Sequence, residues 1–436
     1  MMMILLFCLS SYRSIRMVRM KQCSYVCLRR SSTSIYDSKA KNDDDHGSNK
    51  KKIDDCPSSL FLDGSNRMMN VESLKGKEGI VASRLGLDPT SNRFHQPIVY
   101  HENYSFANWP ESHTFPMDKF ARLAHALQTT SKKTEPNKST LSRPIVRQAS
   151  HFFRPLDVHH IPRAWIAQPT GPIDGTFLDS FLTGTLTNEE ARYIGFREQT
   201  SRPELIERTI LEVAGTVLAC QLAYNYGIAT NAAGGTHHAH PKGGAGYTIL
   251  NDLAIATNFL TSPTLNGFTI NGIHRVLVID CDVHQGDGTA KFSHLLQHKL
   301  FTLSLHCASN YPRLKAHSTF DVGLPDGMED DEYMNALVDN VNHAMDVVNP
   351  DFVLYDAGVD IYEKDKLGRL NITESGIRRR DRWVLERCIS ADIPVAAVIG
   401  GGYDKDVDAL ARRHAIVHEE AAYLWRKYKL WKQSNS

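Results

Sequence analysis

Short, unbroken apolar segments alternate with amphipathic segments along this chain from residue 206 onward. The apolar segments are residues 276–280, 301–306, 351–359 and 395–403. The amphipathic segments, in which apolar residues recur at helical spacing, are residues 206–227, 330–348 and 377–390. Strands without polar alternation are typical of a parallel sheet that helices cover on both faces. We therefore expect an α/β fold, a single large domain with a mainly parallel sheet flanked by helices on both faces. The active site is expected at the carboxyl ends of the strands.

Composition and charge restrict the class of protein. The chain has 436 residues, of which 42% are hydrophobic and 23% charged, and this is a globular composition. Its net charge of +1 gives no reason to expect direct nucleic-acid binding. The 8 cysteines form no C-x-x-C pair, which argues against a zinc finger or a disulfide framework and suits a reducing compartment. We expect no membrane span, because no segment is apolar enough over a sufficient length.

The first part of the chain differs from the rest. Residues 1–36 contain six Lys or Arg, no Asp or Glu, and interleaved serines, a composition typical of an organellar targeting segment. This favours the mitochondrion or another organelle as the location, with the nucleus or cytoplasm as the alternative. Residues 37–96 are polar and charge-clustered and predict a disordered linker. The folded domain is expected at residues 97–428, with an exposed polar loop at residues 129–143 and a short polar tail at residues 429–436.

The segment VLVIDCDVHQGDG places ionisable side chains at the end of an expected strand. Asp280, Asp282 and His284 stand at alternate positions, so an extended chain would send all three the same way. Asp282 and His284 offer an oxygen and a nitrogen ligand, and Asp360, after the segment YDAGV, could add a third. One nitrogen and two carboxylates form a donor set for catalytic zinc or a harder divalent ion. For this segment taken alone, a strand-end turn with solvated acids is the alternative.

A second segment, NAAGGTHHAHPKGGAGY, carries adjacent histidines between runs of glycine. His237 and His238 stand where the backbone can approach a bound substrate closely, because glycine lacks a side chain. Asp280 and Asp287 are spare carboxylates that could hold the two imidazoles in one tautomer. Tyr403 follows three glycines after the last apolar segment, and its phenol could donate a hydrogen bond to an oxyanion. A capping aromatic is the alternative for Tyr403 taken alone.

Four blocks of the sequence resemble the catalytic blocks of the zinc-dependent histone deacetylase superfamily. They are GGTHHAH, DCDVHQGDG, AGVDIYEKDKLG and GGGYDK, in the family's order and at its approximate spacing. The resemblance covers residues 97–428, which it identifies as a histone deacetylase catalytic domain with the arginase/deacetylase fold. The form HQGDG and residues 310–334 look most like the class IV branch and its bacterial relatives.

The resemblance also implies roles for individual residues. The zinc ligands would be Asp282, His284 and Asp360. His238 would be the general base and His237 its electrostatic partner. Asp280 and Asp287 would be the acids behind these histidines, and Tyr403 would polarise the substrate carbonyl.

A second ion and a substrate tunnel are implied in the same way. A structural potassium ion would lie at Asp280, Asp282, His284, Ser304 and Leu305. Tyr247 and Tyr311 would be walls of an acyl-lysine tunnel, with Gly246 beside the first wall. Because relatives mostly have phenylalanine at one or both of these positions, the two tyrosines would make this tunnel more polar.

The reaction that the resemblance implies is zinc-dependent hydrolysis of the amide of N6-acyl-lysine in proteins. The partner would be an acyl-lysine protein or peptide, and the cofactors would be one catalytic zinc ion and a structural potassium ion. An amidohydrolase that acts on acetylpolyamines or other small amides needs the same catalytic groups. A non-catalytic scaffold of the same fold is a third reading. The sequence leaves the length of the acyl chain and the oligomeric state open.

Overall fold

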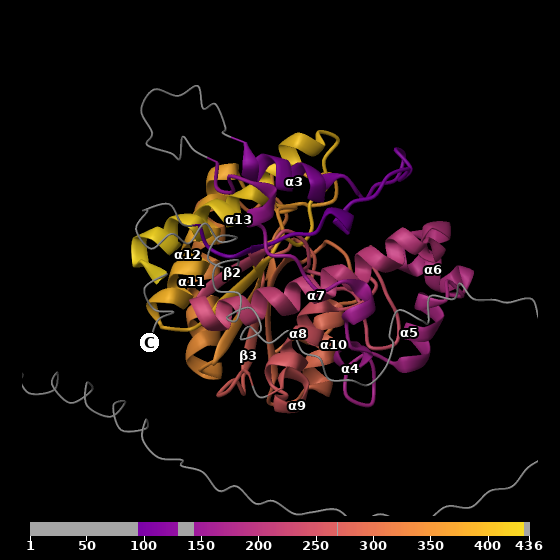
Figure 1. Ribbon diagram of the computed structural model, residues 1–436. Helices are drawn as coiled ribbons and strands as arrows, with labels where there is room; N and C mark the ends of the chain where they lie inside the picture. The colour runs from indigo at the N-terminus through magenta and orange to yellow at the C-terminus, as the bar shows by residue number, and fades with distance from the viewer. Residues whose placement is uncertain (1–94, 130–143, 268, 431–436) are drawn as a thin grey trace, which may run out of the picture. The chain divides into compact units, whose positions relative to one another are not determined.

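Seven strands form one sheet within the residues that this computed structural model describes, which are 95–129, 144–267 and 269–430. The strands are β1 (Ile98–Val99), β2 (Ile228–Asn231), β3 (Val276–Asp280), β4 (Leu300–Cys307), β5 (Phe320–Leu324), β6 (Phe352–Asp356) and β7 (Val395–Val398). They lie in the order β1-β2-β7-β6-β3-β4-β5, and every neighbouring pair is parallel (Figure 1). The predicted α/β fold with a parallel sheet is confirmed.

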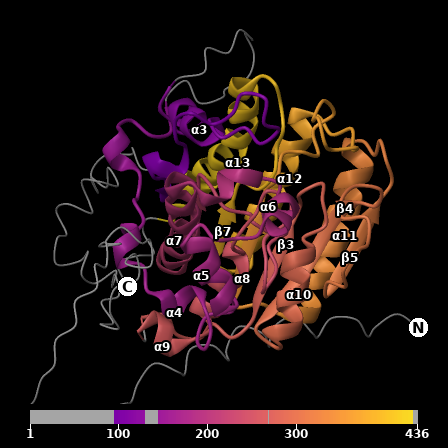
Figure 2. The ribbon, with the colours of Figure 1, turned by 90° about the vertical axis from the view of Figure 1, so that its right-hand side faces the viewer.

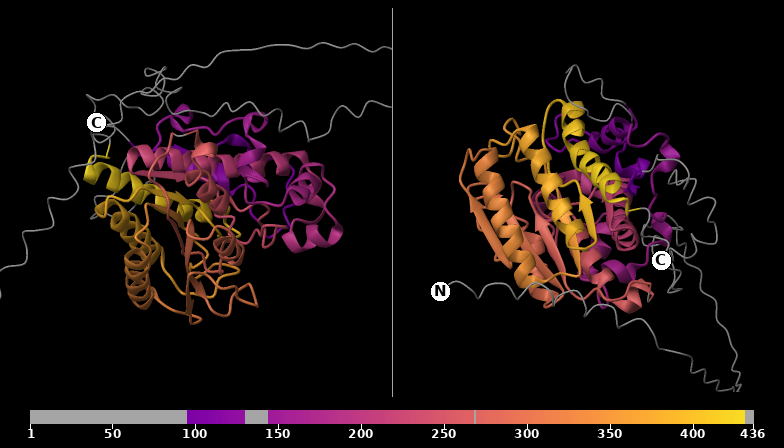
Figure 3. Two further views of the ribbon diagram at one scale, coloured as in Figure 1. Left: turned by 90° about the horizontal axis from the view of Figure 1, so that it is seen from below. Right: turned by 90° about the vertical axis from the view of Figure 1, so that its left-hand side faces the viewer.

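Helices cover both faces of this sheet. In the described part of the chain they are α3 (Lys119–Gln128), α4 (Arg163–Ile166), α5 (Gly175–Leu182), α6 (Asn188–Ile194), α7 (Pro203–Tyr226), α8 (Asp252–Leu260), α9 (Pro263–Asn266), α10 (Asp287–Leu295), α11 (Asp330–Val348), α12 (Glu374–Ser390) and α13 (Val407–Tyr428). Figure 2 shows α7 and α11 on opposite sides of the strands, and Figure 3 shows α11 and α12, in orange, side by side.

Two hydrophobic cores result from the alternation of side chains along each strand. Val276 and Val278 of β3 belong to the core that contains α7 and α8. Leu277 and Ile279 belong to the core that contains α11 and α12. Because successive strand residues point to opposite faces, a strand between the cores can be apolar on both faces, as residues 276–279 of β3 are. This is why the unbroken apolar segments of the sequence correctly predicted β3, β4, β6 and β7.

The carboxyl ends of four neighbouring strands bring the sequence blocks together. β2, β7, β6 and β3 are adjacent in the sheet and parallel. The four blocks are residues 234–240, 280–288, 357–368 and 400–405, and each begins at or just after the end of one of these strands. The predicted position of the site, at the carboxyl ends of the strands, therefore agrees with the fold.

Several predictions fall wholly or partly outside the described residues. They concern the targeting segment 1–36, most of the linker 37–96, the loop 129–143 beyond Thr129, and the tail 429–436 beyond Leu430. His95 and Gln96, which the sequence assigned to the linker, are described and buried, and Gln96 Nε2 donates to the carbonyl of His418 at 3.0 Å.

All described residues belong to one compact unit. None of their helices is both long and apolar enough to cross a membrane.

A buried histidine on α13 makes the stability of this fold depend on pH. Burial lowers the pKa of His418 from its ordinary value of 6.5 to about 3, and its Nδ1 lies 2.7 Å from Thr230 Oγ1. The unfolded chain therefore binds a proton at this residue below pH 6.5, whereas the folded chain does not. Stability from this residue is fully present above pH 6.5 and is lost as the pH falls toward 3.

We expect His418→Asn, which cannot titrate, to flatten the acid side of the stability curve. At pH 5 the wild-type protein should have lost about 2 kcal/mol of unfolding free energy through His418 alone, relative to pH 7.5. Chemical denaturation of both proteins at the two pH values measures this difference. Equal losses in the wild type and in His418→Asn would show that His418 is protonated in the folded state as well.

Candidate metal and catalytic site

The three expected metal ligands lie together beyond the ends of β3 and β6. One ligand atom from each of Asp282, His284 and Asp360 can be chosen so that all three atoms lie within 4.8 Å of one another. His284 Nδ1 is 3.0 Å from Asp282 Oδ1 and 3.1 Å from Asp360 Oδ2. All three residues are buried.

The reason for this convergence differs from the one the sequence suggested. β3 ends at Asp280, so Asp282 and His284 lie in a turn and not on an extended strand. Hydrogen bonds shape this turn, because Asp280 Oδ1 accepts from the backbone N–H of Asp282 and Asp282 Oδ1 accepts from that of His284. Asp280 consequently lies apart from the three-residue cluster and contacts a histidine instead.

Backbone groups from neighbouring loops fix the two carboxylates. Asp282 Oδ2 accepts from the N–H of Gly401 at 2.7 Å, and Asp360 Oδ1 accepts from the N–H of Val283 at 2.8 Å. A Cβ atom on Gly401 would lie 2.3 Å from Asp360 Oδ2 and 2.5 Å from Asp282 Oδ2. The GGGY block thus needs glycine at this position because the carboxylates occupy the space of a side chain.

The charges of this cluster favour a cation. Burial by itself lowers the pKa of His284, but hydrogen bonds to Asp282 and Asp360 raise it to about 10. Burial, together with the charge of Asp282, raises the pKa of Asp360. Two buried carboxylates therefore hold a proton on the imidazole between them, at a place where a metal ion would satisfy all three groups. The donor set of one nitrogen and two carboxylates fits zinc.

The adjacent histidines each face one of the expected acids. His237 Nδ1 lies 2.8 Å from Asp280 Oδ2, and His238 Nδ1 lies 2.7 Å from Asp287 Oδ1, where α10 begins. Burial lowers the pKa of His237, but the charges of Asp280 and Asp282 raise it well above its usual range. Burial, followed by the charge of His237, lowers the pKa of His238 to about 4. At neutral pH His237 is thus charged and His238 is neutral.

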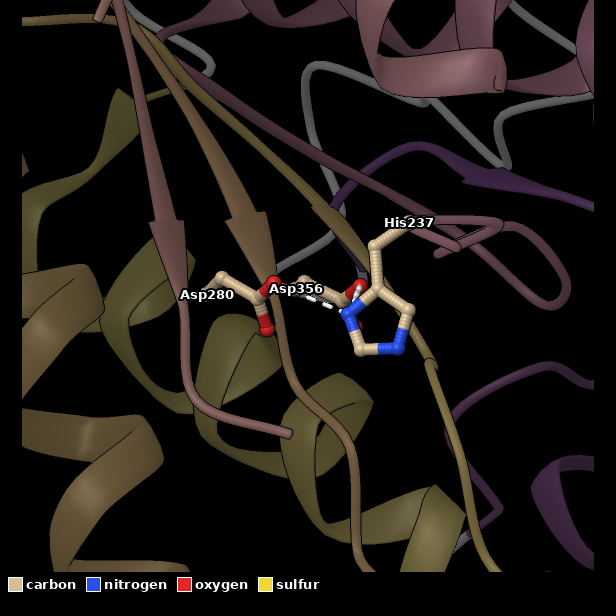
Figure 4. Close-up of side chains that lie close together, drawn as sticks. All are labelled: His237, Asp280 and Asp356. Carbon is tan, nitrogen blue, oxygen red and sulfur yellow. Dashed lines mark hydrogen bonds and ion pairs between the residues drawn. The ribbon is translucent and has the colours of Figure 1, made fainter. Parts of the chain in front are cut away.

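A second acid beside His237 was not predicted from the sequence. Asp356, the last residue of β6, pairs in register with Asp280 of β3 and is fully buried. Its Oδ2 lies 3.9 Å from His237 Nδ1, and Figure 4 shows both carboxylates beside this ring. Neither carboxylate oxygen of Asp356 has a hydrogen-bond partner among the described residues. Burial and the charge of Asp280 raise the pKa of Asp356 well above its usual range.

Asp252 holds the glycine loop that precedes the histidines, a role that no local sequence pattern indicated. Its Oδ2 accepts from the N–H of Gly235 at 3.1 Å, and its Oδ1 accepts from the N–H of Thr236 at 2.8 Å. The hydroxyl of Thr216 on α7 donates to Oδ2 at 2.6 Å. One buried carboxylate therefore ties α7 and α8 to the loop that carries His237.

Tyr403 lies after β7 and is anchored through its backbone. Its N–H donates to Asp365 Oδ2 at 2.7 Å, and its carbonyl accepts from the N–H of Lys366 at 3.1 Å. Burial and the charges of Asp360 and Asp282 raise the pKa of the phenol well above its usual range. Tyr403 is therefore a neutral hydrogen-bond donor, and Asp365, which the sequence analysis did not single out, positions it.

One cavity joins these groups. Asp282, His284, His238 and Tyr403 line it, together with Gly246 and Tyr247 of the expected tunnel. Sequence reasoning missed a further set of lining residues from α3, α7 and the loop before α3, which are Phe115, Lys119, Phe120, Arg208 and Glu212. Their local sequence carries no catalytic pattern, and only the tertiary fold brings them to the site.

The three expected tunnel residues are not placed alike. Gly246 has a φ of +53°, and a Cβ atom there would lie 2.6 Å from Cδ2 of His238. The ring centre of Tyr247 is 6.0 Å from that of Tyr403. Tyr311 lies outside the lining of the cavity, is 39% exposed, and has its ring centre 4.8 Å from that of His238. Tyr311 therefore contacts the candidate base from the solvent side.

Comparison with known proteins identifies the family. The model of the histone deacetylase domain matches residues 176–419, which contain all of the expected site residues. An uncharacterized protein of Picosynechococcus sp. is 41% identical over 326 residues, covering 74% of this chain and 98% of that protein. The chain belongs to the histone deacetylase family. This membership supports deacetylase-type hydrolysis as the class of reaction.

Two further comparisons agree with this assignment. Histone deacetylase 2 of Arabidopsis thaliana is 26% identical to this histone deacetylase family member, covering 79% of this chain and 86% of the relative. The crystal structure of the HDA15 HD domain superposes with a TM-score of 0.51 at 18% identity, covering 78% of this chain and 96% of that structure. At this identity the superposition shows a common fold.

Proposed function

We propose that this protein is a zinc-dependent hydrolase that removes the acyl group from N6-acyl-lysine in proteins. The observation that carries the proposal is one cavity lined by Asp282 and His284 of the metal cluster, by His238 and by Tyr403. Two candidate metal ligands, a neutral imidazole and a neutral phenol thus face the same space. Family membership supports the hydrolysis of an amide as the reaction.

Asp282, His284 and Asp360 would hold the zinc ion. When bound, zinc would polarise the acyl carbonyl and lower the pKa of a water molecule toward ~7. Catalytic zinc sites commonly have three protein ligands and leave a position open for water or substrate. The set of two carboxylates and one imidazole in this cluster meets that requirement.

His238 is suited to take the proton from the attacking water. Its Nδ1 faces the carboxylate of Asp287 at 2.7 Å, which leaves Nε2 to accept a proton. The positive charge of His237, held beside Asp280, helps to keep the pKa of His238 near 4 and therefore keeps His238 neutral before the reaction.

Tyr403 and His238 then complete the reaction. The phenol of Tyr403 donates a hydrogen bond to the oxyanion of the tetrahedral species. His238 returns its proton to the lysine nitrogen while the carbon–nitrogen bond breaks, because an unprotonated amine is a very poor leaving group. The products are the free lysine side chain and the carboxylic acid.

Finer assignments extend this proposal. We propose that the chain belongs to the class IV branch of the family and its bacterial relatives. The HQGDG form and the sequence of residues 310–334 support this placement. We also propose that a structural potassium ion binds at Asp280, Asp282, His284, Ser304 and Leu305. The pairing of Asp280 on β3 with Ser304 on β4, next to Leu305, supports this site. The organellar location that residues 1–36 favour is a prediction of the sequence.

A substrate panel tests the function. The full chain, loaded with zinc, is incubated with peptides that carry acetyl-, octanoyl- or myristoyl-lysine and with acetylated polyamines, and Tyr403→Phe is the matched variant. We expect hydrolysis of at least one acyl-lysine peptide. Tyr403→Phe should lower kcat by about 10²–10³ with unchanged zinc content and melting temperature, because it removes one oxyanion donor.

Each outcome of this panel decides between specific alternatives. Activity on polyamines alone would identify a small-amide hydrolase of the same family. No activity on any substrate, with zinc bound, would contradict the hydrolase and support a scaffold. Equal kcat values for the wild type and Tyr403→Phe would exclude the role of the phenol.

A further inference from the structure

A buried arginine on α12 lies behind the candidate metal centre and takes no part in the proposed mechanism. The side chain of Arg380 is 0% exposed, although a guanidinium group is strongly favoured by water. Asp381 lies beside it, with Oδ1 2.9 Å from Arg380 Nε. A buried charge of this kind requires partners for its other donors.

Those partners are backbone carbonyls of the two loops that carry the metal ligands. Arg380 Nη1 donates to the carbonyl of Cys281 at 3.1 Å and to that of Gly358 at 2.6 Å. Arg380 Nη2 donates to the carbonyl of Ala357 at 3.2 Å. Cys281 directly precedes Asp282, and Gly358 lies two residues before Asp360. One planar guanidinium therefore joins the loop after β3 to the loop after β6.

Gly358 connects this anchor to the metal ligands themselves. A Cβ atom on Gly358 would lie 2.4 Å from Asp282 Oδ2, so the backbone at Gly358 lies directly against the carboxylate of Asp282. His284 Nδ1 bridges Asp282 and Asp360 across the same gap. A displacement of Gly358 would therefore change the separation of the two carboxylates.

We propose that Arg380 is a positioning residue of the metal centre, which sets the separation of the two ligand loops and thereby the affinity for zinc. The proposal rests on the proposed function in one respect, the identity of the metal. Outer groups that orient metal ligands change the metal affinity by about 10–100-fold when they are removed. A residue that only stabilises the fold would leave the affinity of the folded protein unchanged.

The variant Arg380→Lys tests this in the full chain. Lysine keeps the positive charge beside Asp381 but lacks the planar fork that reaches three carbonyls. We expect the zinc dissociation constant, measured by competition with a chelator, to rise by about 10–100-fold. Arg378→Lys is the matched control, because Arg378 lies on the same helix but pairs with Glu419 and Glu420 of α13. It should keep the wild-type zinc affinity even if its melting temperature falls.

A milder variant keeps the test decisive if Arg380→Lys does not fold. The hydroxyl of Tyr355 donates to Asp381 Oδ1 at 2.6 Å, so Tyr355→Phe loosens the partner of Arg380 without changing any charge. Its zinc dissociation constant should rise by about threefold or more, a smaller effect than the ~10–100-fold change expected for Arg380→Lys, because Tyr355 acts on the loops only through Asp381 and Arg380. Unchanged zinc affinity in every folded variant at these two positions would overturn the proposal. An equal loss in Arg378→Lys would overturn it as well.

The proposed function can fail separately from this inference. A wild-type protein that binds zinc tightly but hydrolyses no substrate contradicts the function and leaves the role of Arg380 standing. A wild-type protein that hydrolyses substrate, together with an unchanged zinc affinity in Arg380→Lys, supports the function and contradicts the role of Arg380.

Discussion

Asp360→Asn should abolish zinc binding and hydrolysis together. The side chain keeps its size, and its Oδ1 can still accept the N–H of Val283, so the loop after β6 retains its hydrogen bond. What is lost is the negative charge that faces Nδ1 of His284 at 3.1 Å. Because a direct ligand contributes more than an outer group, we expect the zinc affinity to fall by more than the ~100-fold upper limit of outer-group effects.

Metal analysis of the purified protein and chelator competition measure this effect. Asp351→Asn is the matched control, because Asp351 lies just before β6, at the opposite end of the strand, and accepts from the N–H groups of His274 and Arg275. Asp351→Asn should bind zinc and hydrolyse substrate like the wild type, with some loss of stability. Wild-type zinc content in Asp360→Asn would exclude Asp360 as a ligand.

The sequence predicted four central strands because they are buried on both faces, but it missed the central strand β2, in which Thr230 and Asn231 are polar. β3, β4, β6 and β7 correspond to the unbroken apolar segments of the chain. β5 was missed because it is an edge strand whose first four residues are alternately half-buried and exposed. β1 was missed because two residues are too short for any periodic pattern.

The candidate site was predictable where its chemistry is local in sequence. The segment 280–287 and the adjacent histidines carry several ionisable groups within a few residues, and parallel topology explains why such segments meet. Asp356, Asp365 and Arg380 have no such local pattern. Each acquires its role from partners elsewhere in the fold: His237 for Asp356, Tyr403 for Asp365, and two separate loops for Arg380. A single sequence contains no signal for contacts of that kind.

His238→Ala should remove most of the activity while leaving the zinc affinity unchanged. The variant loses the group that accepts the proton of water and returns it to the lysine nitrogen, and general acid–base groups contribute about 10²–10⁴-fold to the rate. His238 is not a member of the Asp282–His284–Asp360 cluster, so the metal content should equal that of the wild type. The kcat value at saturating zinc and the zinc dissociation constant, measured on the same preparation, separate this effect from that of Asp360→Asn.

Another histidine of the same loop provides the matched control. His240 Nε2 lies 3.3 Å from Asp287 Oδ2, whereas His238 Nδ1 faces Oδ1 of the same carboxylate. His240→Ala therefore removes an imidazole beside Asp287 but leaves the candidate base in place, and we expect its kcat to stay within about tenfold of the wild type, below the range for a general base. If His238→Ala also stayed within that range and His237→Ala did not, the base would be His237. The neutral state of His238, next to a charged His237, would then have no catalytic purpose.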